Sequence, residues 1–308
     1  MKLYRRGKVK DVYEESQDTL VFHFSDRISV FDKVISTPIP NKGAVLCLSA
    51  SHWFSVANDM GIPNHFLGLL SPSRMRVKRF KVIMDYSEIR GEKNYVIPLE
   101  FIARYYVAGS LYDRLKRGVI DAKALGFRSN SVPEYGEELP EPYFEITTKF
   151  EHYDRVVTME EAMEVSCLNK EQIDEIFETI MAIDERIKHD VAKRRLIHVD
   201  GKKEFALGND GEIVLIDTFG TPDEDRWWDA DAYDEGKYVE LSKEAVRQYY
   251  KKISYYDELK RAREKGMEEP PIPPLPENIA KEISRLYVTM YFRITGKDFY
   301  QSIEELTA

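Results

Sequence analysis

Residues 7–25 read GKVKDVYEESQDTLVFHFS, and this stretch indicates how the chain begins to fold. Polar and apolar side chains alternate through 8–13 and again through 20–25, which is typical of two half-buried β-strands. The polar run at 14–18 between them predicts an antiparallel hairpin. Further strands are expected at 77–83, 95–97 and 100–106, so the first part of the chain is predicted to be rich in β-structure.

Helical patterns dominate the rest of the sequence. Between residues 169 and 195, apolar residues recur at intervals of three and four, which predicts a helix with one buried stripe. Ser110 and Asp113 have the spacing of a capping box, so we expect a helix to begin there and to end near Gly118. Further helices are expected at 46–60, 242–265 and 278–295, a strand hairpin at 196–217 with its turn at 208–211, and a stiff proline-rich connector at 270–276.

The bulk composition excludes several classes of protein. The chain has 308 residues, 43% of them hydrophobic, which suffices for one large globular unit or two lobes. A net charge of −9 argues against a dedicated nucleic-acid binder. Two widely separated cysteines and the lack of an 18-residue apolar run fit a reducing cytosol and no membrane span. We therefore expect a cytoplasmic protein with neither nucleic acid nor a membrane as partner.

Two lysines in the opening segment are candidates for binding phosphate. Alternation along a strand places Lys8 and Lys10 on one face, and Gly7 permits close approach of a ligand to the backbone. Two ammonium groups side by side can hold a polyphosphate. An ordinary strand with solvated lysines explains the same pattern, so both interpretations stay open at this point.

The hairpin at 196–217 brings candidate metal ligands together. A four-residue loop at 208–211 or a two-residue loop at 210–211 would place Glu204 and Asp217 on the same face, whereas an odd loop length would separate them. Lys202 falls on that face in either register. Mg²⁺ takes carboxylate oxygens together with substrate phosphates, so this pattern indicates a phosphoryl-transfer site. The alternative is a solvated face with a Lys–Glu pair.

Two arginines are candidates for anion binding. Arg104 lies near the end of a predicted strand, and Ser110 opens the next helix, whose free amide groups attract anions. Arg226 lies between acidic residues and two tryptophans, where it fits either an anion site or a buried structural ion pair.

Nine segments of the chain, taken in order, carry a resemblance to a known family. They are GKVKDVYE (7–14), SDRISVFD (25–32), IPNKGAVLCLSASHWF (39–54), GIPNHFL (61–67), PLEFIARYYVAGSL (98–111), LPEPYFEITTKFEHYD (139–154), DGKKEFAL (200–207), EIVLIDTFGTPDEDRWWD (212–229) and LPENIAKEISRLYVTMYFRITGKDF (275–299). Together they resemble the phosphoribosylaminoimidazole-succinocarboxamide synthase (SAICAR synthetase) family of purine biosynthesis.

The resemblance implies an α+β fold of two lobes, ATP-grasp-like, with a kinase-like β-rich nucleotide-binding lobe at 1–97. A larger α/β lobe at 98–308 would bind substrate and metal and carry the C-terminal helices. The implied enzyme is an ATP-dependent ligase. It would join L-aspartate to the carboxylate of carboxyaminoimidazole ribonucleotide (CAIR) through an acyl phosphate, giving SAICAR, ADP and phosphate. We also expect a homo-oligomer.

The resemblance further implies roles for individual residues. Gly7, Lys8, Lys10 and Glu100 would bind ATP, and Glu204 and Asp217 would bind Mg²⁺. Asp32, Arg104, Ser110 and Arg226 would bind substrate. Lys202, Lys149 and Asp154 would lie at the reacting groups.

The chain also departs from the family pattern. Glu224 and Asp225 stand where the family usually has serines, Thr218 where it has glutamate, and Ala206 where it has glycine. The added acidic residues raise the question of whether Arg226 still binds a phosphate. Three other functions compete with the ligase: a small-molecule kinase, favoured by the DFG-like string at 217–220, a non-catalytic nucleotide-binding module, and an interaction protein.

Overall fold

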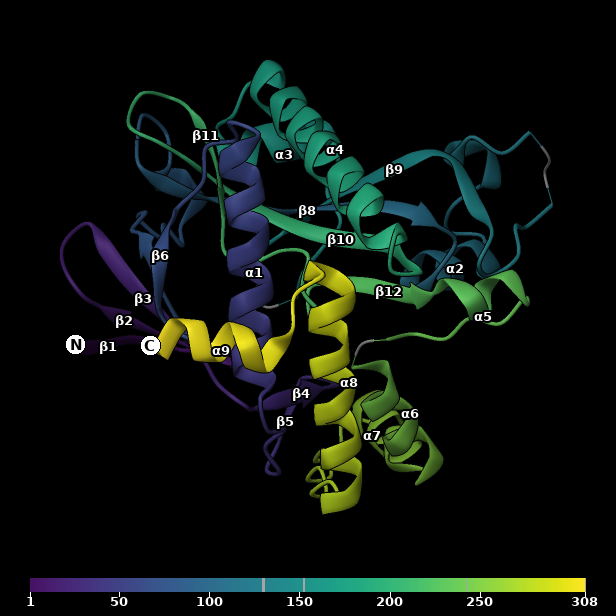
Figure 1. Ribbon diagram of the computed structural model, residues 1–308. Coiled ribbons are helices and arrows are strands. Elements are labelled where there is room, and N and C mark those ends of the chain that lie inside the picture. The colour runs from purple at the N-terminus through teal and green to yellow at the C-terminus, as the bar shows by residue number, and fades with distance from the viewer. Residues whose placement is uncertain (129–130, 152, 242, 308) are drawn as a thin grey trace.

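The computed structural model describes residues 1–128, 131–151, 153–241 and 243–307, and the side chains of residues 244 and 245 lie outside the description as well. Helices and strands are mixed in an α+β fold (Figure 1). The described strands form two larger sheets and one small hairpin. None of the helices in these ranges is both long and apolar enough to cross a membrane.

The first sheet is antiparallel, in the order β1–β2–β3–β7–β6. Its strands are β1 (Lys2–Arg6), β2 (Lys10–Glu14), β3 (Thr19–Phe24), β6 (Phe66–Ser71) and β7 (Arg74–Lys78). The predicted hairpin is confirmed as β2 and β3, which pair from Lys10↔Phe24 to Glu14↔Leu20. No strand was predicted at the positions of β1 and β6, and the strand expected at 77–83 lies earlier, at β7.

The second sheet has the order β9–β8–β10–β11, and β12 pairs with the first half of β10 on the edge that β11 continues. Its strands are β8 (Tyr95–Tyr106), β9 (Glu138–Thr148), β10 (Leu196–Leu207), β11 (Ile213–Ile216) and β12 (Asp225–Asp229). The strands expected at 95–97 and 100–106 form one strand, β8. This strand runs across the boundary predicted at 97/98, and the division into two lobes stays a prediction.

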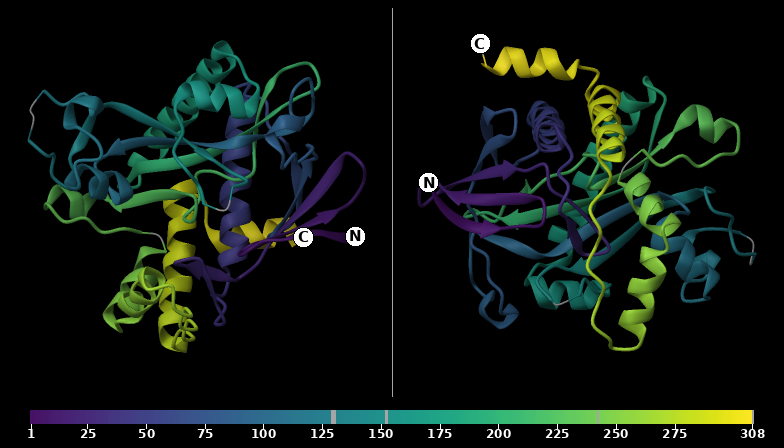
Figure 2. Two further views of the ribbon diagram at one scale, coloured as in Figure 1. Left: turned by 180° about the vertical axis from the view of Figure 1, so that it is seen from behind. Right: turned by 90° about the horizontal axis from the view of Figure 1, so that it is seen from below.

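Helices pack against the sheets and against one another. Their bounds are α1 (Lys42–Asp59), α2 (Gly109–Lys116), α3 (Met159–Ser166), α4 (Lys170–Ala192), α5 (Ala230–Asp234), α6 (Glu244–Lys252), α7 (Tyr255–Glu264), α8 (Glu277–Thr295) and α9 (Phe299–Thr307). Short 3₁₀ turns lie at Tyr86–Glu88 and Ala122–Leu125, and the small hairpin is β4 (Ile28–Val30) with β5 (Lys33–Ile35). The α1 helix packs on β3, β6, β7 and α8, and passes in front of β8 and β10 in Figure 1 but behind them in Figure 2 (left).

The α4 helix confirms the helix predicted between 169 and 195. Asn169 and Gln172 form a capping box at its start, and the isoleucines of the predicted stripe are buried against β10 and β11. On the face of the second sheet that α4 covers, the charged pair Lys203–Asp184 is buried, and the hydroxyl of Tyr105 donates to Asp184 at 2.7 Å. Because side chains alternate along a strand, Lys202 and Glu204 project from the opposite face.

The helix expected at 242–265 is divided. Ser242 lies outside the described residues, and the remainder forms α6 and α7, separated at Ser254. Ser254 has φ 61°, a left-handed conformation that a continuous helix does not contain.

Candidate functional site

The polar face of β8 and β10 carries a dense group of charges. Glu100 of β8 pairs directly with Glu204 of β10, and Lys202 lies two residues before Glu204 on the same face. Like charges in a directly opposed pair destabilise a sheet unless cations separate them. Lys202 supplies one such cation, and Lys149, just beyond the end of β9, supplies a second.

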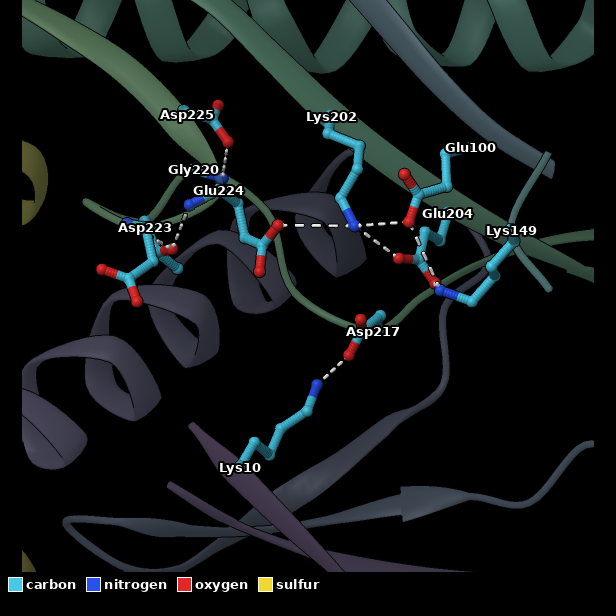
Figure 3. Close-up of polar contacts among 11 residues, drawn as sticks. Lys10, Glu100, Lys149, Lys202, Glu204, Asp217, Gly220, Asp223, Glu224 and Asp225 are labelled. Atoms are coloured by element: carbon cyan, nitrogen blue, oxygen red, sulfur yellow. Dashed lines mark hydrogen bonds and ion pairs between the residues drawn. The ribbon is translucent and has the colours of Figure 1, made fainter. Parts of the chain in front are cut away.

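These four residues form what we call the lysine–carboxylate cluster (Glu100, Lys149, Lys202 and Glu204; Figure 3). The Nζ of Lys202 lies 2.7 Å from Glu204 and 2.9 Å from Glu100. Lys149 contacts Glu204 and lies 3.6 Å from Glu100. Glu204 is only 2% exposed, so its charge depends on the two lysines.

The two carboxylates of the cluster respond differently to burial. Burial raises the pKa of Glu100 to about 7, although the neighbouring lysines lower it. Burial alone would also raise the pKa of Glu204, but Lys149 and Lys202 outweigh it and hold that pKa well below its ordinary value. Glu204 is therefore the anion that orders the cluster, whereas Glu100 can take up a proton near neutral pH.

Asp217 reaches the site by a route that the sequence did not indicate. Glu204 pairs with Ile216, so the hairpin loop has an odd length and a regular strand would point Asp217 to the other face. The prediction that register places both carboxylates on one face is wrong. The strand β11 instead ends at Ile216, and Asp217 adopts φ 60°, which turns the chain and lets its carboxylate meet Lys10.

The loop that follows Asp217 is anchored by buried groups. His65 Nε2 lies 3.3 Å from the carbonyl oxygen of Asp217, and burial lowers the pKa of His65 to about 3, so its ring is neutral. Trp53 Nε1 donates to the carbonyl oxygen of Gly220 at 3.0 Å, and the amide of Gly220 donates to Asp225 at 3.0 Å. These contacts hold the left-handed conformation of Asp217 in place. Neither His65 nor Trp53 was predicted as a site residue, because each reads as an ordinary core residue.

Residues 7–9 form a loop rather than part of a strand. The amide of Gly7 donates to the carbonyl oxygen of Lys10 at 2.9 Å, so a tight turn joins β1 to β2 and the strand begins only at Lys10. The same-face argument for Lys8 and Lys10 is therefore wrong. Lys10 points inward, contacts Asp217 and lies 4.3 Å from the centre of the Phe22 ring. Lys8 is exposed and pairs with Asp32 at 2.8 Å.

A cleft of about 840 Å³ lies between the first sheet and the polar face of the second. Its polar end contains Lys10, Lys149, Lys202, Glu204, Asp217 and Glu224. Its apolar lining, which we call the apolar recess, consists of Val12, Leu20, Phe22, Phe80, Val82, Met84, Val96 and Ile216. Gly7, Lys8 and Val9 contribute to its wall as well. An apolar recess beside a group of charges suits a planar base attached to a polyphosphate.

A second group of charges lies further along the same face, around two arginines that we call the arginine pair (Arg104 and Arg226). Asp200 of β10 stands two residues before Lys202, about 7 Å away along the strand. It accepts from Arg104 Nη1 at 3.2 Å and also contacts Arg226. Arg104 Nη2 donates to Ser110 Oγ at 3.2 Å. The structure thus brings Arg104, Ser110 and Arg226 together, as expected.

The start of α2 differs from the prediction in a way that serves this group. Ala108 is the N-cap and no side chain caps the helix, so the predicted capping box of Ser110 and Asp113 is wrong. The hydroxyl of Ser110 is directed to Arg104 instead. Gly109 has φ 52°, and a Cβ atom there would lie 2.5 Å from Nη2 of Arg226. The guanidinium group therefore rests against the bare backbone of Gly109.

The acidic residues beside Arg226 contact other groups of the site. Asp225 is buried and bonds to His198 at 2.7 Å and to Gly220, while Glu224 faces Lys202 at 3.5 Å. Arg226 pairs with Asp200 and, at 3.1 Å, with Glu240. Alternation at the start of β12 sends Asp225 into the protein and Glu224 and Arg226 to the site face.

Asp154 stands apart from the other candidates. It is exposed, in the loop beyond Lys149, and is not among the residues that line the cleft. Asp32 is exposed too and is linked to the cleft through its ion pair with Lys8. Their assigned roles stay predictions.

The donor set fits a magnesium ion that arrives with a nucleotide. Within the described ranges, no three His, Cys, Asp or Glu residues are grouped so that they could already hold a metal. Lys149 and Lys202 are engaged by Glu204, and Lys10 by Asp217. Phosphates can recruit these lysines only if another cation takes over the carboxylates, and Mg²⁺, which prefers oxygen ligands and keeps substrate phosphates, meets that need.

Comparison with known proteins points to one family. Residues 3–262 match the family described as SAICAR synthetase. The phosphoribosylaminoimidazole-succinocarboxamide synthase of Thermoplasma acidophilum is 54% identical over 297 residues, covering 96% of this chain and 99% of the relative. That of Nitrosopumilus maritimus is 34% identical over 304 residues, covering 96% and 99%.

Solved structures agree in fold. A SAICAR synthetase in complex with ADP superposes with a TM-score of 0.69 at 26% identity and covers 96% of this chain and 99% of its own. The SAICAR synthase from Saccharomyces cerevisiae, solved with SAICAR, has a TM-score of 0.74 at 23% identity and covers 96% and 95%. These matches extend over nearly the whole of each chain.

Proposed function

The chain belongs to the SAICAR synthetase family, and we propose that it uses ATP to join L-aspartate to the carboxylate of CAIR, with the lysine–carboxylate cluster as its reaction centre. The observation that carries this proposal is the arrangement of one polar sheet face. It bears an arginine pair, a cluster of lysines and carboxylates, and an apolar recess, in that spatial order.

The arginine pair would bind the phosphate of CAIR. Arg104 and Arg226 present two guanidinium groups, and Ser110 adds a hydroxyl beside them. Guanidinium forks match the geometry of phosphate oxygens. With its phosphate held there, the imidazole carboxylate of CAIR would point along β10 toward Lys202.

The apolar recess would hold the adenine of ATP, and the polar end would hold its phosphates. Support comes from the related SAICAR synthetase that was solved with ADP. Lys10 and the loop formed by Gly7, Lys8 and Val9 line the polar end from the first sheet. Lys149 and Lys202 line it from the second sheet. The transferring phosphoryl group would therefore meet cations from two sides.

Glu204 and Asp217 would hold Mg²⁺, which when bound neutralises phosphate charge during transfer. The lysines released from these carboxylates would then bind phosphate oxygens. Glu100 would accept a hydrogen bond from Lys202 and keep its ammonium group oriented.

The chemistry requires activation of a poor acyl donor. A carboxylate does not react with an amine at a useful rate, so ATP would phosphorylate the carboxylate of CAIR. The amino group of aspartate would then attack the acyl phosphate, and inorganic phosphate would leave. The protein would supply orientation and charge stabilisation, and no side chain need act as a covalent nucleophile.

We further propose that the reaction takes place in the cytoplasm, where ATP and aspartate are available, and that the chain forms a homo-oligomer. Both free cysteines, buried Cys47 and exposed Cys167, are consistent with a reducing compartment.

One assay tests the proposed function. Purified protein is given ATP and Mg²⁺ with CAIR, with aspartate, or with both, and ADP and SAICAR are measured. The proposal predicts that ADP forms rapidly only when both substrates are present, in equal amounts with SAICAR. ADP formed with an alcohol acceptor would instead identify a kinase, and no turnover of any mixture would favour a binding module.

A further inference from the structure

Glu224 is a carboxylate in the cleft to which neither the family pattern nor the proposed reaction assigns a task. Its side chain is 26% exposed, and it lines the polar end of the cleft. In Figure 3 it projects from the loop before β12 toward Lys202, across the space above Asp217. A fourth carboxylate in a site for anionic substrates requires a reason.

Neutralising Lys202 is only part of that reason, although Glu224 helps to raise the pKa of Lys202. Lys202 already has Glu204 at 2.7 Å and Glu100 at 2.9 Å, whereas Glu224 lies 3.5 Å away. Lys202 is the one ion-pair partner of Glu224 found within the described ranges. Removal of Glu224 would leave Lys202 paired, and removal of Lys202 would leave Glu224 with open hydrogen-bonding capacity toward the cleft.

The backbone around Glu224 is held firmly. Its amide donates to Thr221 Oγ1 at 3.3 Å, and Thr221 is 1% exposed. The next residue, Asp225, is anchored by His198 and Gly220. A carboxylate on such a support is oriented before any ligand arrives, as a binding group should be.

The position of Glu224 selects the kind of ligand that it meets. It lies two residues before Arg226, about 7 Å along the chain, and so between the arginine pair and the cluster. The phosphates and carboxylates of ATP and CAIR are anions, which a neighbouring carboxylate repels. The single cationic group among the substrates is the ammonium group of L-aspartate, and it must come close to the carbonyl carbon at the Lys202 end.

We propose that Glu224 binds the ammonium group of L-aspartate and accepts the proton that this group must lose before its nitrogen can attack. This inference rests on the proposed function. The N–C bond forms at the acyl carbon, and the C–O bond to phosphate breaks with its electron pair on the leaving oxygen. The second proton on nitrogen passes to the departing phosphate, and Glu224 returns its proton to water after SAICAR is released.

The experiment compares wild type with Glu224→Gln, which keeps the size of the side chain but removes its charge. Steady-state rates give KM for aspartate, and calorimetry gives the affinities for CAIR and Mg-ATP. Inhibition by succinate, which is aspartate without its ammonium group, reports on the remainder of the aspartate site. Glu235→Gln is the matched control, because Glu235 is exposed and pairs only with Lys237 among the described residues.

Glu224→Gln should raise KM for aspartate by about 10- to 100-fold, as for loss of a hydrogen bond to a charged group. Succinate inhibition, CAIR binding and Mg-ATP binding should be as tight as in wild type or tighter, because these ligands are anions and the substitution removes a carboxylate that repels them. The control should match wild type throughout. Thermal melts establish that each variant is folded. Glu224→Ser, which introduces a short uncharged polar side chain, should show the same selective defect.

Three results would overturn the proposal. An unchanged KM for aspartate would show that Glu224 does not contact its amino group. An equal loss of succinate and aspartate binding would show a general effect on the pocket. A weaker response to Mg²⁺ or CAIR as the main defect would make Glu224 a ligand for those groups. Failure of wild type to form SAICAR is a separate outcome, and it would reject the proposed function itself.

Discussion

Substituting Gly109 by alanine should weaken CAIR binding without unfolding the protein. A Cβ atom at this position would lie 2.5 Å and 2.7 Å from the two terminal nitrogens of Arg226. Ordinary contacts require about 3.5 Å or more, so the guanidinium group must move by about 1 Å. Because the clash involves the far end of a long side chain, the guanidinium can yield, and the main consequence is a displaced phosphate-binding group.

Gly109→Ala should have two separate effects, one on the stability of the protein and one on the KM for CAIR. A left-handed alanine costs about 1–2 kcal/mol in stability, since only glycine adopts φ 52° without strain. A lost hydrogen bond to a charged group costs about 1.5–3 kcal/mol in binding, which corresponds to roughly a 10- to 100-fold higher KM for CAIR. The KM for aspartate and the affinity for ATP should change little.

Gly118→Ala separates the two terms. Gly118 follows the same helix, has φ 69°, and has open space where a Cβ atom would stand. It should show the same loss of stability in a thermal melt and a normal KM for CAIR in an ADP-release assay. If both variants bind CAIR equally well, or equally badly, the inferred contact between Gly109 and Arg226 has no role in substrate binding.

Three further perturbations test other parts of the structure. In Asp217→Asn the new side chain also tolerates φ 60°, so the variant should stay folded while turnover falls by roughly 10²-fold or more. Near-normal turnover at any Mg²⁺ concentration would reject the metal-binding role of Asp217. Trp53→Phe removes the donor to the Gly220 carbonyl in a fully buried position, so the free energy of urea unfolding should fall by about 1–3 kcal/mol and turnover should require more Mg²⁺. An unchanged Mg²⁺ titration would show that the loop keeps its position without this hydrogen bond. Burial would raise the pKa of Asp223, but Lys42 outweighs it and the pKa is lowered to about 2. The pair therefore contributes about 2 kcal/mol to stability above pH 4, and this contribution is lost as the pH falls toward 2. The stability difference between wild type and Asp223→Asn should shrink over that pH range, and a constant difference would contradict the assignment.

Much of the fold could be predicted from the sequence, because local patterns of polar and apolar residues determine several of its elements. The β2–β3 hairpin and α4 were both predicted from alternation or from apolar spacing, and both are confirmed. The pattern failed where tertiary contacts decide the conformation. All five residues of β1 are exposed, so its sequence lacks a buried face that alternation could reveal. The helix expected at 242–265 breaks at Ser254, whose left-handed backbone no propensity indicates.

The candidate site shows the same division. Glu204 and Lys202 project together because they lie two residues apart on one strand, and that spacing is legible in the sequence. Asp217 joins them only because its backbone turns left-handed, supported by His65 from a distant segment. Glu204 and Asp217 therefore face the same cleft, but not for the geometric reason that the predicted register supplied. The position of Glu224 depends on where Asp225 is anchored, and that anchor, His198, lies on another strand.

The central step of the proposed reaction is transfer of a phosphoryl group from ATP to the carboxylate of CAIR at the lysine–carboxylate cluster. CAIR labelled with ¹⁸O in its carboxylate tests this directly, by mass spectrometry of the inorganic phosphate released with SAICAR. One ¹⁸O atom is expected in each phosphate, because the C–O bond of the acyl phosphate breaks when aspartate attacks. Phosphate without the label, formed at the same rate as SAICAR, would contradict it.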